Sequence, residues 1–556
     1  MSQTYRLLSE GMPGPRGVGA PTFQADARKT RLWVAALPRA NALATQQSLD
    51  TALDSLAGQR LDGSQRLSVL EELRSAIGES IGLLKREYAG SALPLAASKA
   101  AAAHQVEAFH LALGHGYRMA AVEICSPAGN IPMLRGNTVA TTLARSTWHY
   151  VQALAVAWRV YRAPPAGAWQ GLHRLRHFAI EHRLDARQVD DVLAGGPVEI
   201  RTLYLQSLLM AITHPLAFSQ VEQDLLWQCT RGFAGNCNVS RTLPGDNAPV
   251  VPEDADRGPG PAVVGEPATQ WLDMKAFCVE VDDALARQAD GHAELVASGG
   301  KGIRLSVEML ERLRRSFGLS AARSHKRLPA SHVLRTVFGL SSLHFYLAGQ
   351  RDFDSFMRQA SQQIVHIVDR ASWAGAATDA SRVPVHEATV LDQSLGGYRM
   401  AWAHASQIRA RVGELVGLTL ADADEYPEWM LGVIRWLRYE ADGGLSAGIE
   451  LVSRRTAAVG LRVHGSDGFT QEPIRALEMR SLVDEEVNFL APNTLDCGAT
   501  RIEVVRDLVA GAENEARVEE ILAGVDVLLN AGDYALLRPL RSDLVAEAET
   551  EAGAVQ

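Results

Sequence analysis

The chain has 556 residues, of which 47% are hydrophobic and 21% are charged, so it can bury a large core and is expected to hold several domains. Its formal net charge of −9 and its pI near 6.0 argue against nucleic acid as a partner and against binding to anionic membrane surfaces. The five cysteines show no CxxC spacing, which favours a reducing, cytoplasmic location and predicts no metal site.

The first 40 residues predict a loose N-terminal tail. The stretch MSQTYRLLSEGMPGPRG has no basic segment followed by an apolar one, so it is not typical of a targeting signal. Apolar runs further along the chain are cut by arginine well short of the roughly 18 residues that a membrane-spanning helix needs. We therefore expect no membrane insertion.

Residues 41–235 are expected to form a helical domain. In SLDTALDSLAGQRL and SQRLSVLEELRSAIGESIGLLKREY, leucine and isoleucine recur every three or four residues, with charges on the opposite face. Later helical segments stop at Pro164 and Pro165 and then resume. This pattern predicts a helical bundle or a solenoid-like array, without a clean repeat period.

Residues 236–320 are predicted to be a linker with short strands and helices. Six prolines between Asn236 and Thr269 indicate either a linker or two short edge strands joined by a long turn. Helical patterns return in WLDMKAFCVEVDDALARQA and in LSVEMLERLRRSFG, where Ser306 can cap the helix and Gly318 can end it.

Residues 321–460 read as short strands rich in β-branched and aromatic residues, separated by Gly, Asp or Pro turns, which predicts a small antiparallel barrel. A helical insertion is expected at 350–383, a small β-containing module at 461–546 and a disordered tail at 547–556. The fold class predicted is thus α+β and multidomain: an all-α region, a β-barrel with an insertion and a C-terminal β module.

Three motifs suggest chemistry that their context does not support. GLSAG around Ser446 fits a hydrolase nucleophile elbow, but a strand-like segment follows where a helix is required. His173 and His177 have metal-ligand spacing, yet two arginines lie between them, so half-exposed helical histidines are favoured. LGHGYRMA lacks the third glycine of a dinucleotide loop. We therefore expect no enzyme and no catalytic residues.

Two other motifs point to an anion with a flat base. Arg323 and Arg327 form R-x-x-x-R in a loop that enters a strand; such pairs are common by chance in a chain this rich in arginine. Asp392, Ser394 and Gly397 form the rarer D-x-S-x-x-G at a turn between two strands. Arginine pairs bidentately with guanine or phosphate, whereas the carboxylate accepts hydrogen bonds from guanine N–H groups.

Together these residues resemble the PilZ domain, the bacterial receptor module for cyclic-di-GMP, over about residues 321–453. Three further segments fit: VFGLSSLHFYLAG as the opening strand, LGVIRWLR as a middle strand and GGLSAGIELVS as a closing strand. The resemblance implies a six-stranded barrel in which cyclic-di-GMP, rather than a cofactor, is bound by Arg323, Arg327, Asp392, Ser394 and Gly397. It implies binding and signalling without catalysis.

One departure leaves an alternative open. The 65 positions from Arg327 to Asp392 exceed what one hairpin needs, so the insertion must leave the barrel between its first two strands, and it could cover the ligand face. The chain is therefore expected to be a cyclic-di-GMP effector whose helical region contacts a protein partner. The alternative is a helical interaction scaffold with a degenerate, non-binding barrel.

Overall fold

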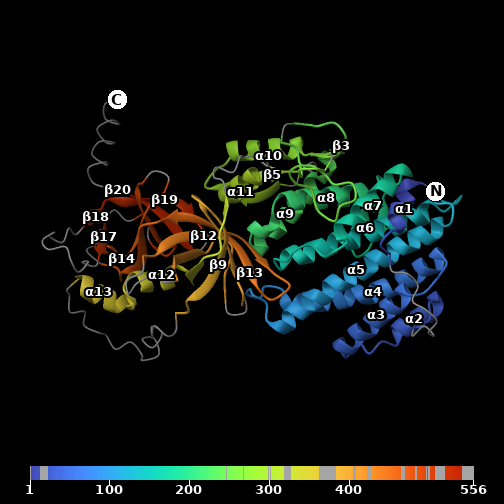
Figure 1. The fold of residues 1–556 in the computed structure, drawn as a ribbon, viewed down its shortest axis with the longest axis horizontal. Coiled ribbons are helices and arrows are strands. Elements are labelled where there is room, and N and C mark those ends of the chain that lie inside the picture. The colour runs from blue at the N-terminus through green and yellow to red at the C-terminus, as the bar shows by residue number, and fades with distance from the viewer. Residues whose placement is uncertain are drawn as a thin grey trace. The chain divides into compact units, whose positions relative to one another are not determined.

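The computed structural model (Figure 1) divides the chain into two compact units, Met1–Arg323 and Ser324–Gln556. Among the helices it describes, none has the length and apolar character needed to cross a bilayer. The residues described are 2–12, 23–317 without 246, 267, 298–299 and 301, then 327–361, 383–404, 408–421, 428–464, 470–482, 485–495, 497–498, 501–506, 520–531 and 533–540.

The first unit is dominated by helices, as its periodicity predicts. In α4 the Asp62 side chain accepts a hydrogen bond from the Ser64 N–H and caps the helix, while Leu70, Leu73 and Ile77 are buried on one face. The helices are α1 (Gln3–Ser9), α2 (Ala27–Ala35), α3 (Ala42–Ala57), α4 (Gly63–Tyr88), α5 (Ala97–Cys125), α6 (Gly136–Arg159), α7 (Ala168–Glu181), α8 (Ile200–Ile212), η1 (Pro215–Ala217), α9 (Gln220–Phe233), η2 (Ala234–Asn236), α10 (Lys275–Ala286) and α11 (Val307–Phe317).

The expectation of a loose tail over residues 1–40 is wrong for the residues described there. Helices α1 and α2 form in this stretch, each capped by its own residue, Ser2 or Asp26. Leu8 is fully buried, and Arg118 of α5 donates to the Leu8 carbonyl at 2.8 Å and to the Glu10 carbonyl at 2.6 Å. These contacts come from a helix more than 100 positions away, so local composition does not reveal them.

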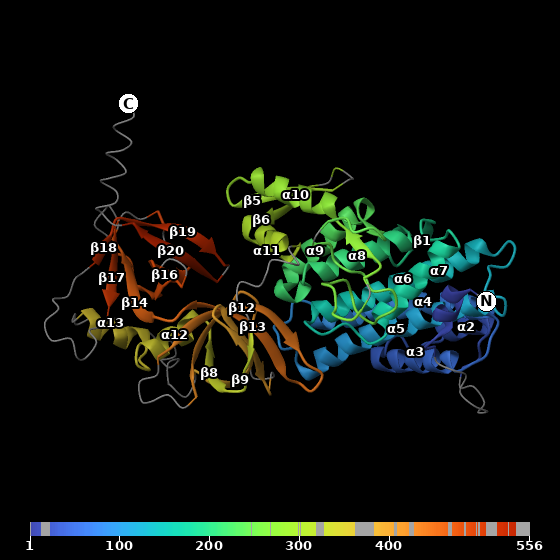
Figure 2. The ribbon, with the colours of Figure 1, turned by 45° about the horizontal axis from the view of Figure 1, so that its top comes forward.

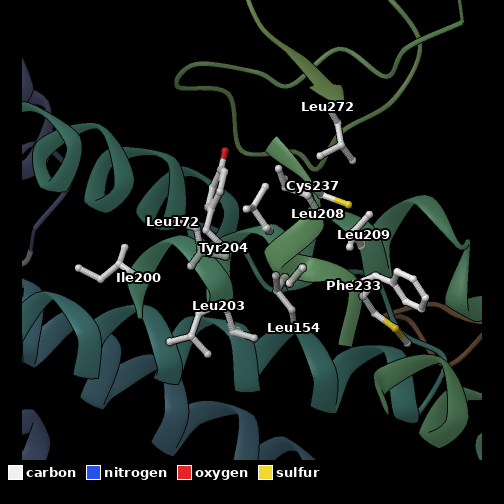
Figure 3. Close-up of a cluster of buried hydrophobic side chains, with 14 of the residues drawn as sticks. Leu154, Leu172, Ile200, Leu203, Tyr204, Leu208, Leu209, Phe233, Cys237 and Leu272 are labelled. Atoms are coloured by element: carbon white, nitrogen blue, oxygen red, sulfur yellow. The ribbon is translucent and has the colours of Figure 1, made fainter. Parts of the chain in front are cut away.

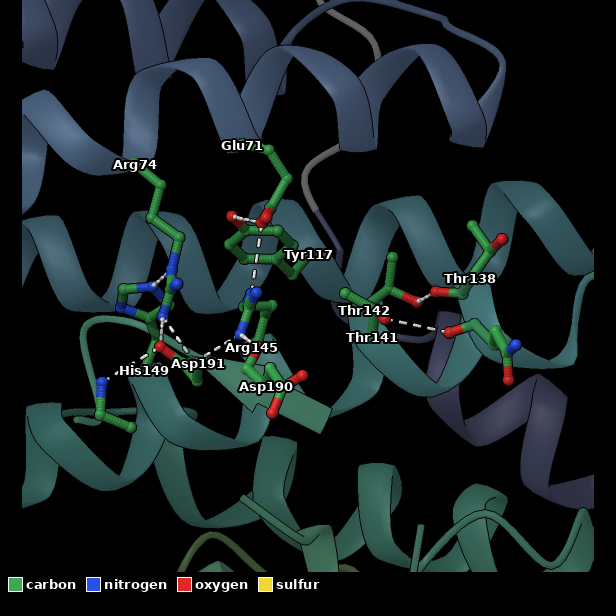
Figure 4. Close-up of polar contacts among 12 residues, drawn as sticks. Glu71, Arg74, Tyr117, Thr138, Thr141, Thr142, Arg145, His149, Asp190 and Asp191 are labelled. Atoms are coloured by element: carbon green, nitrogen blue, oxygen red, sulfur yellow. Dashed lines mark hydrogen bonds and ion pairs between the residues drawn. The ribbon is translucent and has the colours of Figure 1, made fainter. Parts of the chain in front are cut away.

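A buried ionic network fixes a β-hairpin to this bundle (Figure 4). The hairpin consists of β1 (Val189–Asp191) and β2 (Gly196–Val198). Its Asp191 carboxylate, fully buried, accepts hydrogen bonds from Arg74 at 2.9 and 2.7 Å and lies 2.8 Å from Arg145. Arg74 also donates to His149 at 3.1 Å. One carboxylate thus neutralises cations from two helices, α4 and α6.

Residues 236–317 are not a free linker where the structure describes them, because they share the core of the helical unit. Figure 3 shows Leu272 beside Leu208, Leu209 and Cys237 in this core. Two short strands do pair, β3 (Asn238–Ser240) with β4 (Trp271–Asp273), but only β3 lies between Asn236 and Thr269, and β4 occupies the start of a segment predicted to be helical. A further hairpin, β5 (His292–Val296) and β6 (Gly302–Ser306), precedes α11. Although the segment contains six prolines between Asn236 and Thr269, its apolar side chains are packed in the core of the helical unit.

The second unit contains a closed antiparallel barrel, which confirms the predicted α+β multidomain class. Its six strands follow the circular order β8, β9, β10, β13, β12, β11, and β7 pairs with the end of β9 beyond β8. Figure 2 shows β8, β9, β12 and β13 of this barrel. The strands are β7 (Leu328–Pro329), β8 (Val333–Phe338), β9 (His386–Ser394), β10 (Gly397–Trp402), β11 (Leu415–Leu420), β12 (Met430–Tyr439) and β13 (Leu445–Ser453).

The proposed opening strand VFGLSSLHFYLAG is only partly a strand. β8 ends at Phe338, Gly339 adopts φ +83°, and α12 follows over Leu340–Leu347. A positive φ at Gly339 interrupts the extended backbone, and the apolar side chains beyond it are spaced for a helix. The insertion therefore begins before residue 350 and continues with α13 (Phe353–Ser361); residues 362–382 lie outside the described part.

The C-terminal module is a second antiparallel sheet, in the order β18, β17, β14, β15, β16, β20, β19. It starts at Thr456, so the boundary expected after residue 460 cuts through a strand; the first sheet ends at Ser453. The strands are β14 (Thr456–Val463), β15 (Ile474–Arg480), β16 (Val487–Pro492), β17 (Ile502–Arg506), β18 (Glu520–Leu522), β19 (Gly524–Asn530) and β20 (Tyr534–Leu540). The predicted tail at 547–556 lies outside the described residues.

Replacing Asp191 by Asn should destabilise the helical unit by about 3–5 kcal/mol, because it leaves Arg74 and Arg145 buried without their shared counterion. Chemical denaturation followed by circular dichroism measures this loss. The matched control is Asp224→Asn, which breaks the more exposed pair with Arg159 and should cost about 1 kcal/mol or less. Equal denaturation midpoints for the two variants would contradict this role of Asp191.

Candidate functional site

The D-x-S-x-x-G segment forms a tight hairpin between β9 and β10. Ser394 pairs with Gly397, which leaves only Leu395 and Gly396 in the turn. Gly397 has φ +150°, and a Cβ atom built on it would lie 2.0 Å from the carbonyl oxygen of Ile449 in β13. Any other residue would push β10 away from β13, so glycine is required by this close backbone approach.

A short arm places Arg327 beside this hairpin. In β7, Leu328 pairs with Gln393 and Pro329 with Asp392. The Arg327 guanidinium donates to the Asp392 carboxylate at 2.5 Å. The Arg327 side chain is 39% exposed and that of Asp392 is 21% exposed, so both can reach a ligand from solvent. The predicted meeting of the arginine loop with the D-x-S-x-x-G turn is thus seen for Arg327, whereas Arg323 lies outside the described residues.

Arg399 is a further candidate residue at this hairpin, and the sequence motifs did not identify it. It lies opposite Asp392 in the β9–β10 ladder, and its Nη1 is 4.0 Å from the second carboxylate oxygen. Its Nε atom is buried and has no hydrogen-bond partner among the described residues. The only sequence signal is its place two residues after Gly397, which does not distinguish it from any other strand arginine.

The same cross-strand row continues away from the turn. Gly448 of β13 lies opposite Arg399, and Trp436 of β12 lies opposite Gly448. A Cβ atom on Gly448 would be 2.0 Å from the indole Nε1 of Trp436, so the indole packs directly over the glycine backbone. An arginine and a flat aromatic ring thus extend the row that begins at Asp392.

The remaining groups at the hairpin are suited to contacts with a nucleotide. The Ser394 hydroxyl donates to the Gly397 carbonyl across a long distance, 3.4 Å, and can turn to another acceptor. Leu328 and Leu395 are 54% and 68% exposed, and both lie beside the polar groups. One carboxylate between two arginines leaves a local positive charge on an acidic protein, which attracts anions despite the overall charge.

The described part of the insertion packs away from this hairpin. Leu343 of α12 shares a core with Val337 and Leu415 of the barrel and with Leu477 of the second sheet. In α13, Phe356 and its buried neighbours pack against Ala458 and Val505 of that sheet. Helices α12 and α13 therefore leave Asp392 uncovered.

The other motifs are structural. Ser446 lies inside β13, which continues as a strand to Ser453, so no nucleophile elbow forms. His173 is fully buried rather than half-exposed, with its pKa lowered by burial to about 4. Its ring bonds the Tyr204 hydroxyl at 2.7 Å and the Arg257 carbonyl at 3.0 Å. LGHGYRMA lies within α5. No group of metal-binding side chains is found in the part of the chain that the structure describes.

Comparison with known proteins gives two matching family models. The N-terminal domain of the cyclic-di-GMP receptor FimW matches residues 28–244, and its middle PilZ domain matches residues 265–381 and 366–457. Cyclic-di-GMP receptor FimW of Pseudomonas aeruginosa is 24% identical over 525 residues, which cover 84% of this chain and 84% of that protein. The second match contains the whole barrel, and neither match extends past residue 457.

Replacing Gly397 by Ala should lower the stability of the barrel by about 2 kcal/mol or more, because the new methyl group collides with the Ile449 carbonyl. Differential scanning calorimetry would show the loss as a lower melting temperature. Leu395→Ala, a change at an exposed position in the same turn, should stay within about 0.5 kcal/mol of the wild type. A Gly397→Ala protein that melts with the Leu395→Ala control would refute the need for glycine.

Proposed function

The chain belongs to the PilZ domain family, and from that premise we propose that it is a receptor for cyclic-di-GMP that binds the ligand at the β9–β10 hairpin. The observation that carries the proposal is the convergence of Arg327, Asp392, Ser394 and Gly397 at one corner of the barrel. These residues come from positions up to 70 apart in the sequence. Arg323, only four positions before Arg327, would complete the set.

The chemistry of the corner fits the two parts of the ligand. The Asp392 carboxylate accepts hydrogen bonds from the ring N–H and amino group of guanine, which are both donors. Arg327 and Arg399 supply planar guanidinium groups for phosphate oxygens and for the O6 and N7 acceptors of guanine. The exposed Leu328 and Leu395 side chains offer apolar surface to the faces of the purine rings.

Ligand binding would exchange one ion pair for several contacts. Arg327 occupies one oxygen of Asp392 in the structure. Guanine donors at this carboxylate would free Arg327 to turn toward a phosphate, so the total number of charge-assisted hydrogen bonds rises. The exchange costs little because the Arg327–Asp392 pair is partly exposed to solvent.

The signal would reach the helical unit through α11. This helix ends at Phe317, only ten positions before Arg327. It is firmly held in its own unit: Leu310, Leu313 and Phe317 are buried in the core, and Arg312 donates to Glu222 of α9 at 2.8 Å. Contacts of Arg323 and Arg327 with the ligand would therefore act on a segment whose preceding helix is rigidly attached, which would couple binding to the helical unit.

Isothermal titration calorimetry with cyclic-di-GMP tests the receptor proposal. We expect binding by the wild type and at least about 100-fold weaker binding by Asp392→Asn and by Arg327→Ala, because each loses a charged hydrogen-bonding group. Arg538→Ala, at an exposed arginine of the second sheet, should bind as the wild type does. Absence of heat with the wild type would instead support a helical scaffold with a non-binding barrel.

Arg312→Ala tests the coupling separately. It removes the link from α11 to Glu222 and the stacking of the guanidinium 4.3 Å from the Phe218 ring centroid. In the wild type we expect the ligand to change amide hydrogen exchange in α9 and α11. In Arg312→Ala, the affinity for cyclic-di-GMP should stay within about threefold of the wild-type value. The ligand-induced change in amide hydrogen exchange of α9 should be lost. An unchanged response in α9 would rule out this route.

A further inference from the structure

The C-terminal sheet repeats the strand order of the PilZ barrel. In the barrel, β8 pairs with β9 and β11, β9 with β10, β10 with β13, and β13 with β12. In the second sheet, β14 pairs with β15 and β17, β15 with β16, β16 with β20, and β20 with β19. All of these pairs are antiparallel. The sequential order of the strands is therefore the same in both.

The pairing of β11 with β12, which closes the first barrel, also has a counterpart in the second sheet. In the first barrel, the first part of β12 pairs with β11, and the strand pairs with β13 over its length. In the second sheet, β18 pairs with β17 and β19 pairs with β20. Only Ala523 separates β18 from β19, and its N–H donates to the Leu540 carbonyl of β20 at 2.8 Å. Residues 520–530 thus act as one strand that joins both ends of the sheet.

The buried core agrees with this closure. Each of the seven strands contributes to one hydrophobic cluster, which includes Leu461, Ala476, Phe489, Val504, Leu522, Val525 and Leu537. In an open sheet, the two edge strands would lie too far apart to share a cluster with every other strand. From the strand order and this core, we infer that residues 456–540 are a second barrel of PilZ topology that binds no ligand and instead holds the helical insertion of the first barrel.

The chemistry of the ligand site is missing from the second barrel. Only Arg454 and Arg455 connect β13 to β14, so no loop is long enough to wrap a nucleotide. The connection from β15 to β16 reads RSLVDEEV, without D-x-S-x-x-G or any glycine. Val487, a β-branched residue, starts β16, where Gly397 starts β10. This conclusion rests on the proposed site in the first barrel.

The outer face of the second barrel is occupied by the insertion. His344 of α12, whose pKa is lowered by burial to about 4, is neutral and donates from Nε2 to the Val459 carbonyl at 3.3 Å. Arg475 of β15 donates to Ser341 at 3.2 Å. Gly460 leaves room for α13, because a Cβ atom there would lie 2.4 Å from the sulfur of Met357. The views in Figures 1 and 2 both place α13 beside β14 and β17.

The second barrel therefore has a defined role in the receptor. The insertion leaves the first barrel between β8 and β9, which are also the strands that follow the arginine loop and carry Asp392. By binding α12 and α13 on its own surface, the second barrel keeps these helices off the hairpin where the ligand is expected. It is an internal docking partner and does not add a second receptor site.

Amide hydrogen exchange on the full chain tests the inference without ligand, so its outcome is independent of the receptor proposal. In the wild type, residues 520–522 and 524–530 should both be protected, as a closed barrel requires. Gly460→Val should speed exchange in α13 at least about tenfold, because the side chain displaces Met357. Ala457→Val, at an exposed position of the same strand, should leave α13 unchanged.

Met357→Ala provides a second variant in case Gly460→Val does not fold. It should also speed amide hydrogen exchange in α13. If the amides of residues 520–522 exchange as fast as those of an open edge strand, the inference that the second sheet closes into a barrel is wrong. Wild-type exchange in α13 of both variants would overturn the docking role. Cyclic-di-GMP binding that survives Asp392→Asn and disappears when Arg455→Ala is added would overturn the claim that the second barrel binds no ligand.

Discussion

The close approach of Gly397 to the backbone of β13 is the contact on which the candidate site depends. It lets β10 pair with β9 and β13 at once, which closes the barrel at the end where the hairpin lies. Because the closed ladder fixes the register, Asp392 faces Arg399, and the β7 arm brings Arg327 to the same carboxylate. A backbone constraint thus decides where the charges lie.

The charged side chains of the candidate site form only partly exposed ion pairs. A single carboxylate faces two arginines at a partly exposed corner, so the proposed binding of an anionic nucleotide would not have to break a strong buried pair. The Arg74–Asp191 pair in the helical unit is the opposite case, since it is almost fully buried and serves to hold a hairpin. The two ion pairs use the same chemistry, and their difference in burial is what suits the first to the proposed binding role and the second to a structural one.

Apolar packing holds both sides of the segment between the two units. The helical unit ends in a helix that is fixed in its core by apolar side chains and by Arg312, and the arginine loop follows directly. The barrel itself shares a hydrophobic core with α12 and the second sheet. In the proposed receptor, this bracing would favour transmission through the segment between the barrel and α11.

The sequence by itself determined the helical region, the short strands, the D-x-S-x-x-G turn and the resemblance that identified the family, because helical periodicity and turn chemistry act over a few residues. It did not reveal that Arg118 fixes the N-terminal helices, that Gly339 ends β8 early, or that Arg399 faces Asp392. Nor did it reveal the repeated strand order after Ser453. Only the tertiary structure decided these features, because each depends on which strands or helices, distant in sequence, become neighbours in the fold.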